Sequence, residues 1–130
     1  MTLVILGIDQ KTGEAHYRNA GHTPLMWMNN RINTVIEGGS PLGFDAIPNL
    51  GRRQFRMQEG DRIFIYSDGL VSNRTGEGKK ITWKVLSGKL REFAEPEDLI
   101  AELRPFVDNF IRDRENDDTA CIALHFLRRG

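Results

Sequence analysis

The hydrophobic pattern changes period twice along this chain, and these changes constrain the fold more than any other feature. Up to about residue 67, apolar residues form short runs separated by Gly, Pro and Asn, which is typical of β-strands. From about Thr82 to Ile111 they recur at helical spacing, and Thr119–Leu127 alternates again. Strands, then helices, then a strand predict an α+β fold, a layered β-sandwich flanked by helices whose apolar faces cover a sheet.

The strand-forming part divides into segments joined by turns. We predict strands at Thr2–Asp9, Glu14–Asn19, Pro24–Met28, Asn33–Ile36, Arg53–Met57 and Arg62–Ser67. The first two flank a turn sequence ending in Gly13, and the next two flank the Asn-Asn-Arg turn at 29–31. The first third of the chain is therefore predicted to be an antiparallel meander.

Two amphipathic helices follow. The first apolar stripe comprises Val85, Leu86, Leu90 and Phe93, and the second comprises Leu99, Ile100, Leu103, Phe106, Val107, Phe110 and Ile111. Pro96, with the acids Glu97 and Asp98 after it, suits the start of the second helix. Pro105 removes a backbone donor inside it, so we expect a kink or a break near Arg104.

Composition excludes several function classes. The chain has 130 residues, with 18 Lys and Arg balanced by 18 Asp and Glu, so a nucleic-acid partner is not expected. Its apolar runs are far shorter than the roughly 20 residues of a membrane helix. The single cysteine, Cys121, excludes an internal disulfide and suits a cytoplasmic location. Residues 1–130 are predicted to form a single domain.

The first candidate site is the Ser-Asp-Gly sequence at 67–69. A carboxylate at the end of an apolar strand, as predicted for Asp68, projects beyond the sheet, and Gly69 lets a metal or phosphate approach the backbone. The same sequence is also ordinary turn composition. Taken alone, it does not distinguish a metal ligand from a turn.

The second candidate site is the Asn-Asp-Asp-Thr sequence at 116–119. The neighbouring carboxylates of Asp117 and Asp118 repel one another unless a cation or solvent lies between them, which favours a divalent metal. A solvated loop whose acids accept hydrogen bonds from nearby amides is the alternative. A third segment, Asn-Ala-Gly-His-Thr-Pro at 19–24, places His22 at a bend, but no second His or Cys completes a zinc signature.

The order of these segments resembles a known family. Asn-Ala-Gly-His-Thr-Pro, then Pro-Leu-Gly at 41–43, then Gly-Asp-Arg-Ile-Phe-Ile-Tyr-Ser-Asp-Gly-Leu at 60–70, then Asp-Asp-Thr-Ala at 117–120 occur in series. The chain is similar along its length to the C-terminal portion of a type 2C (PPM) protein serine/threonine phosphatase domain, in the bacterial sporulation stage II E branch. The resemblance implies a sandwich fold incomplete at its N-terminus.

The resemblance also implies the chemistry. It makes Asp68 and Asp117 ligands of Mn²⁺ or Mg²⁺, which the family holds in pairs through carboxylates and water, and no side chain acts as the nucleophile because water attacks phosphorus. Two ligands of one ion would lie with carboxylate oxygens roughly 3–4.5 Å apart. The residues implied at the site periphery are Asp118, His22, Gly69, Asn19 and Gly21. The implied substrate is phosphoserine or phosphothreonine on a regulatory protein of the anti-sigma-factor antagonist type.

Two upstream motifs of the family are not found in this sequence. These are a Gly-Gly-Asp segment and an Asp-x-x-Gly-His-Gly segment, which supply further metal ligands. The chain by itself is therefore expected to hydrolyse phosphoserine peptides poorly, and a non-catalytic phosphatase-fold regulatory or phosphoprotein-binding domain is the alternative. An apolar edge strand such as Thr2–Asp9 would also favour a homodimer or strand exchange.

Overall fold

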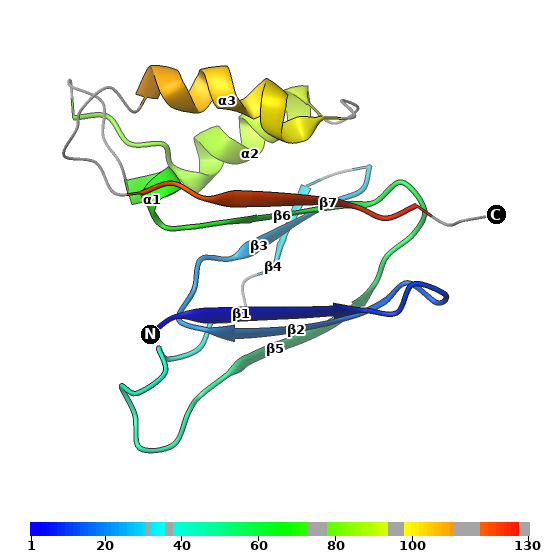
Figure 1. The fold of residues 1–130 in the computed structure, drawn as a ribbon, viewed down its shortest axis with the longest axis vertical. Coiled ribbons are helices and arrows are strands. Elements are labelled where there is room, and N and C mark those ends of the chain that lie inside the picture. The colour runs from blue at the N-terminus through cyan, green and yellow to red at the C-terminus, as the bar shows by residue number, and fades with distance from the viewer. Residues whose placement is uncertain (31, 36–37, 73–77, 94–97, 111–117, 128–130) are drawn as a thin grey trace.

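Two antiparallel sheets and a helical layer make up the computed structural model, which describes residues 1–30, 32–35, 38–72, 78–93, 98–110 and 118–127 (Figure 1). Sheet A has the strand order β1-β2-β5, and sheet B has the order β4-β3-β6-β7. The strands are β1 (Leu3–Ile8), β2 (Glu14–Ala20), β3 (Leu25–Met28), β4 (Ile32–Val35), β5 (Gly51–Arg56), β6 (Arg62–Tyr66) and β7 (Cys121–His125). The predicted α+β layered sandwich is confirmed.

The helices α2 (Trp83–Glu92) and α3 (Leu99–Phe110) cover the face of sheet B that points away from sheet A (Figure 1). A four-residue helix, α1 (Gly69–Ser72), follows β6 directly and was not predicted. Helix α2 begins where Thr82 Oγ1 accepts a hydrogen bond from the Val85 amide at 3.3 Å. None of the helices in the described ranges is long and apolar enough to cross a membrane.

Helix α3 continues through Pro105. A kink or a break was predicted near Arg104; the helix runs unbroken from Leu99 to Phe110, so the break is excluded, and the kink stays a prediction. Pro105 is exposed, whereas Leu99 and Leu103 are buried against sheet B, and this packing outweighs the loss of one backbone hydrogen bond. The start of α3 is capped by Asp98, whose Oδ1 accepts from the Ala101 amide at 2.9 Å. Pro96 and Glu97 lie outside the described residues.

The predicted meander is wrong at its centre. Strands β1 and β2 pair, and β3 and β4 pair, but β2 and β3 belong to different sheets. The chain changes sheets at Gly21, whose φ of 67° is the left-handed conformation that glycine adopts without strain. Strand β2 then takes β5 as its second neighbour, and β3 takes β6. The bend at Gly21 therefore separates β2 from β3, and pairing with strands distant in sequence completes the two sheets.

Two hydrophobic cores hold the layers together. The core between the sheets contains Ala15, Tyr17, Leu25, Val35, Met57, Ile63 and Phe126. The core between sheet B and the helices contains Met26, Met28, Phe64, Tyr66, Leu70, Ile81, Leu86, Leu90, Leu99 and Leu103. Strand β7 pairs with β6, and its Cys121 and Ala123 pack against the second core, so the predicted place of the terminal strand is confirmed.

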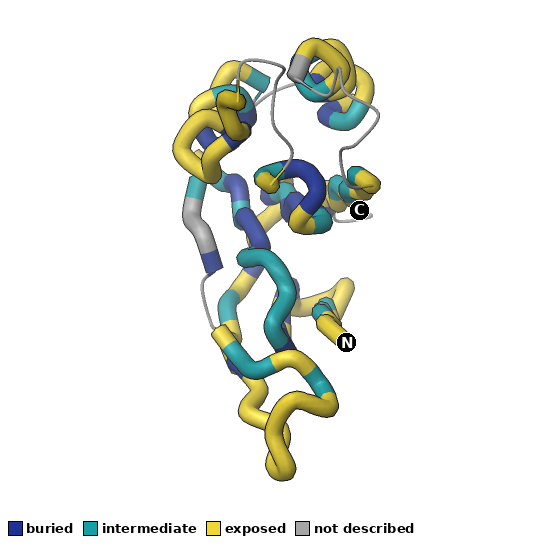
Figure 2. The backbone as a smooth tube through the Cα atoms, turned by 90° about the vertical axis from the view of Figure 1, so that its left-hand side faces the viewer, coloured by how far each residue is buried: buried dark blue, intermediate teal, exposed yellow. Residues whose placement is uncertain are grey.

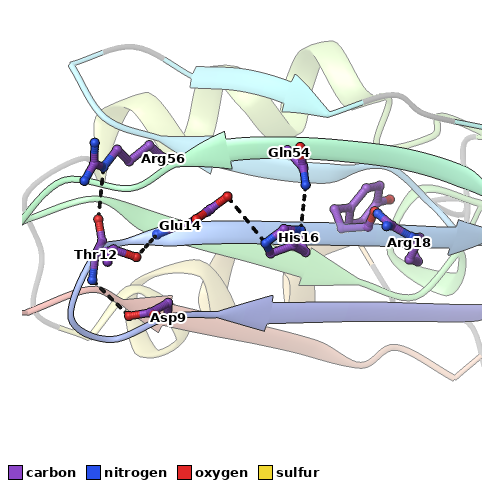
Figure 3. A network of polar contacts seen from close by, with 8 residues as sticks. Asp9, Thr12, Glu14, His16, Arg18, Gln54 and Arg56 are labelled. Atoms are coloured by element: carbon purple, nitrogen blue, oxygen red, sulfur yellow. Dashed lines mark hydrogen bonds and ion pairs between the residues drawn. The ribbon is translucent and has the colours of Figure 1, made fainter.

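The outer face of sheet A is polar along β2 and β5 and is not covered by a described helix (Figures 1 and 3). His16 lies there, 3.6 Å from the Glu14 carboxylate and 3.0 Å from Gln54 Nε2. In the β1–β2 turn, the amides of Thr12 and Lys11 donate to Asp9 and hold the pKa of its carboxyl below the usual value. Residues 38–50, which precede β5, also lie at the surface and are mostly exposed (Figure 2).

Candidate active site

The four motifs of the sequence analysis are linked by contacts at one end of the sandwich, beside α1. A Cβ on Gly21 would lie 2.6 Å from Pro41 Cγ, so the first motif packs tightly against the Pro-Leu-Gly loop. The Thr23 hydroxyl donates a hydrogen bond to the Tyr66 carbonyl at the end of β6. Ser67, the next residue, contacts the Asp-Asp-Thr-Ala segment. Segments up to 53 residues apart in sequence therefore share one rim of the molecule.

Asp68 lies between β6 and α1. Its carbonyl accepts from the amides of Val71 at 3.0 Å and Ser72 at 2.8 Å, which closes the turn of α1. Gly69 and Leu70 are buried and anchor this turn, whereas the Asp68 side chain is exposed. The strand and the buried start of α1 thus fix the backbone from which a solvent-facing carboxylate projects.

Ser67 joins the two acidic segments. Its amide donates to the Ala120 carbonyl at 2.8 Å, and its Oγ accepts from the Ala120 amide at 2.9 Å. The same hydroxyl lies 3.3 Å from the Asp118 carbonyl, to which it donates. Both backbone groups of Ala120 are therefore held by one residue. Because Asp68 follows Ser67 directly, these bonds fix the position of residues 118–120 relative to Asp68.

The bend at residues 19–22 is held by a buried side chain. Asn19 is 2% exposed, and its Oδ1 accepts from the His22 amide at 2.7 Å. Its Nδ2 donates to the His22 carbonyl at 3.0 Å and to the Tyr17 hydroxyl at 2.8 Å. The half-buried His22 ring lies with Nδ1 3.5 Å from Thr2 Oγ1. Asn19 therefore shapes the corner and does not face the solvent side of the site.

Three residues with structural roles were not singled out from the sequence, namely Thr23 and Ser67 at this end and Asp61 at the opposite end of β6. Thr23 and Ser67 were part of quoted motifs, but their hydrogen bonds depend on contacts between strands. Asp61 is 5% exposed, and its Oδ2 accepts from Trp27 Nε1 and from the Gln58 amide, each at 2.9 Å. The available sequence signal for Asp61 was a carboxylate directly before a buried strand.

The base of the site is apolar. Tyr66 is buried, and this burial raises the pKa of its phenol. The nearby Tyr17 raises this pKa further. Burial also raises the pKa of the Cys121 thiol, at the start of β7. Both groups therefore stay protonated at neutral pH, and neither provides a base or a nucleophile there. The acidic side chains at the rim are the chemically distinctive groups.

Of the predicted ligand pair Asp68 and Asp117, only Asp68 lies in the described part of the chain. Asp68 and Asp118 are described and exposed, whereas Asp117 lies outside the described residues, so its distance from Asp68 stays a prediction. Within the described ranges, no three His, Cys, Asp or Glu side chains gather closely enough to hold a metal ion. The described residues offer carboxylate oxygen, which suits Mn²⁺ or Mg²⁺, but they do not form a complete metal site.

A match to a known protein family covers all four motifs. The family described as Stage II sporulation protein E (SpoIIE) matches residues 1–127. The chain belongs to the SpoIIE family. No curated protein sequence matches it.

Solved structures show the fold that this SpoIIE-family chain shares. The RsbU and RsbW domains of Rv1364c from Mycobacterium tuberculosis match with a TM-score of 0.78 at 23% identity, over 99% of this chain and 37% of that one. The phosphatase domain of SpoIIE from Bacillus subtilis matches with a TM-score of 0.70 at 16% identity, over 99% and 60%.

A third structure is the SiaA-PP2C domain of Pseudomonas aeruginosa, with a TM-score of 0.80 at 13% identity, over 96% of this chain and 51% of that one. The shared fold is therefore that of PP2C-type (PPM) phosphatase domains. The chain spans less than two thirds of each of these structures.

Proposed function

We propose that this chain carries part of the active site of a metal-dependent protein serine/threonine phosphatase. The observation that carries the proposal is the Ser67 contact, because it places the segment Asp118–Ala120 against the strand end that presents Asp68. Membership of the SpoIIE family and the phosphatase names of two structural neighbours support the same reaction class.

In this proposal, Asp68 and Asp117 are metal ligands, and Asp118 lies beside them. Ser67 acts as a positioning residue, since its hydroxyl and amide hold Ala120 and so orient the acids before it. His22, Asn19, Gly21 and Gly69 shape the surrounding rim. No side chain of this set attacks phosphorus, and the protonated Cys121 and Tyr66 do not supply a base.

The charge of the site explains why a cation is required. Asp68 and Asp118 are both exposed at this rim, and a phosphate dianion brought there would be repelled by them. Bound Mn²⁺ or Mg²⁺ would neutralise this repulsion, activate a water and polarise the phosphoryl group. In this proposal, Asp117 and residues outside the described ranges supply the remaining ligands, because no three ligand-type side chains gather among the described residues.

We propose phosphoserine or phosphothreonine on a regulatory protein of the anti-sigma-factor antagonist type as the substrate. Asp68 and Asp118 are exposed at this rim, which suits a phosphorylated side chain carried on a folded protein. The name RsbU of one structural neighbour, and the cell-fate role printed for SpoIIE of Bacillus subtilis, favour a regulatory phosphoprotein over a metabolite.

The test measures phosphate release from a phosphoserine peptide in the presence of Mn²⁺. It compares the chain with a version joined upstream to the Gly-Gly-Asp and Asp-x-x-Gly-His-Gly segments of a family member. We expect weak turnover by the chain alone and metal-dependent turnover by the longer version. Asp68→Ala in the longer version should lower the rate by about a hundredfold or more.

Asp108→Ala is the matched control. Asp108 is an exposed acid on α3, paired with Arg104 at 3.6 Å, and its loss should leave the rate unchanged. Full activity of the Asp68→Ala variant would show that Asp68 is not a ligand. Strong turnover by the short chain would refute the requirement for further ligands.

A second candidate is a non-catalytic domain that binds a phosphoprotein through the same fold. It is favoured by the lack of any three-ligand cluster among the described residues. This candidate predicts metal-independent binding of the phosphoprotein and no phosphate release by the longer version at any Mn²⁺ or Mg²⁺ concentration. Calorimetric binding, measured beside the turnover assay, separates the two candidates.

A further inference from the structure

Helix α2 and the residues just before it carry a local excess of positive charge, in a chain whose formal net charge is zero. Residues 78–91 contain four lysines, one arginine and no acidic residue. Lys80, before the helix, and Lys84, in its first turn, are both exposed. Within the described ranges, neither is paired with a carboxylate, whereas Lys89 is paired with Glu92 at 2.6 Å. The charge that the chain itself does not neutralise is therefore gathered near the start of α2.

A large apolar side chain lies among these cations. Trp83 is 59% exposed and Val85 is 41% exposed, at the start of the same helix. Leu86 and Leu90 are fully buried against sheet B, so the core-facing side of α2 is complete without them. Aromatic side chains that stay exposed beside cations are typical of protein-binding surfaces, where they supply contact area and the cations supply orientation.

The exposed side of α2 also has a gap. Gly88 lies inside the helix, where glycine is less favourable than alanine, yet a Cβ on it would meet no described atom within 4 Å. Packing within the described chain therefore does not require a glycine here. Because it follows Lys84 by four residues and precedes Arg91 by three, it leaves room for a partner's backbone between two exposed cations. We define the basic patch by the exposed residues Lys80, Trp83, Lys84, Gly88 and Arg91.

The basic patch lies at the same end of the molecule as the candidate site. Ile81, just before α2, and Leu70 of α1 are buried in one core, and α2 starts at the end of the helical layer where α1 lies (Figure 1). Helix α2 packs on β4 and α3 packs on β7, and these strands are the opposite edges of sheet B. Strands added beside β7 would therefore lie away from α2 and its basic patch.

We propose that the basic patch docks an acidic segment of the regulatory phosphoprotein while its phosphorylated side chain occupies the rim at Asp68. This inference rests on the proposed function. Charge complementarity selects the acidic occupant, and Trp83 offers it an apolar contact. A lipid surface fits poorly, because Leu86 and Leu90 are buried and cannot enter a membrane. The cations of the helix span only about 10 Å, which is short for a nucleic-acid backbone.

The first test measures binding without turnover, so it does not depend on phosphatase activity. A fluorescein-labelled peptide of glutamate and leucine should bind the chain, and the same peptide with glutamine in place of glutamate should not. Lys80→Glu combined with Lys84→Glu should raise the Kd about tenfold or more. Gly88→Leu should weaken binding similarly by filling the gap. An acid in the first turn of α2 suits the helix dipole, so the charge-reversed variant should keep its unfolding midpoint in urea.

Lys11→Glu combined with Arg52→Glu is the matched control. It makes the same change in net charge at exposed positions on sheet A, and it should leave the Kd unchanged. Equal weakening by both double variants would overturn the basic patch as the binding site. Tighter binding of a single-stranded oligonucleotide, or of phosphatidylserine vesicles, than of the acidic peptide would overturn the assignment of its occupant.

The second test uses the longer version from the turnover assay. Reversing the charges of Lys80 and Lys84 should raise the KM for a phosphoserine peptide with flanking glutamates about tenfold, with kcat unchanged, and should not affect a peptide without glutamates. A lowered kcat at constant KM would overturn docking. If the longer version does not bind the labelled peptide although the chain does, upstream polypeptide covers the basic patch and the proposal fails. Absent turnover by the longer version would refute the proposed function, and the first test would still decide the basic patch.

Discussion

Asn19→Ala tests whether the bend that carries the chain from sheet A to sheet B depends on one side chain. The amide of Asn19 makes three hydrogen bonds, with the His22 amide, the His22 carbonyl and the Tyr17 hydroxyl, at 2.7, 3.0 and 2.8 Å. Asn19 and Tyr17 are 2% and 0% exposed, so water replaces these bonds poorly. A net contribution of about 1 kcal/mol for each bond, with extra cost for buried groups left unsatisfied, gives a loss of about 2–4 kcal/mol.

The assay is equilibrium unfolding in urea, followed by circular dichroism and tryptophan fluorescence. Asn19→Ala should lower the midpoint without a large change in slope, because the surface exposed on unfolding is nearly the same. Asn19→Asp keeps the size and the acceptor for the His22 amide but loses both donors, and it should destabilise the fold by a comparable amount.

Gln54→Ala provides the control. Gln54 also contacts a histidine, since its Nε2 lies 3.0 Å from His16 Nδ1, but this contact is on the exposed outer face of sheet A (Figure 3). Its loss should change the free energy of unfolding by about 0.5 kcal/mol or less. An Asn19→Ala variant as stable as the Gln54→Ala variant would refute the assignment of the bend to Asn19.

Three further predictions concern other residues. Asp61→Ala should cost about 2–3 kcal/mol in urea unfolding, because the Trp27 indole and a backbone amide lose a buried acceptor, and Asp61→Asn should cost less. Asp9 has a lowered pKa in the folded chain, so its carboxylate stabilises the fold above its unfolded pKa of about 4, and this stabilisation is lost as the pH falls. Asp9→Asn should therefore reduce the decline of the melting temperature between pH 6 and pH 3. The raised pKa of Cys121 should make its alkylation by iodoacetamide at pH 8 slower in the folded than in the urea-unfolded chain, and equal rates would contradict its burial.

Local sequence patterns predicted most strands and helices, because the formation of each one depends mainly on residues that are close together in the sequence. The change to helical spacing at about Thr82 marked the start of α2, and the apolar stripe of α3 marked a helix despite Pro105. Of the kink or break predicted near Arg104, the break does not occur, because helical propensity is a local quantity, whereas the burial of Leu99 and Leu103 is tertiary. The short helix α1 was missed because four residues are too few to show a period.

The site was predictable in its components but only partly in its geometry. The motif around Asp68 and its resemblance to the phosphatase family came from the residues alone, and the family match over residues 1–127 agrees with them. The roles of Ser67, Thr23 and Asp61 were not predictable, because a hydroxyl or carboxylate has no partner until strands distant in sequence lie side by side. The position of Asp117 relative to Asp68 stays a prediction.

By itself, the sequence determined the order of strands and helices, the family, and which acids to examine, because these depend on local periodicity and on short motifs. Only the tertiary structure decided how the strands divide between two sheets, since that division follows from the left-handed bend at Gly21 and from nonlocal pairing. It also decided that Ser67 holds residues 118–120 against the end of β6. Packing between distant segments, which no local pattern encodes, is the physical reason for each of these outcomes.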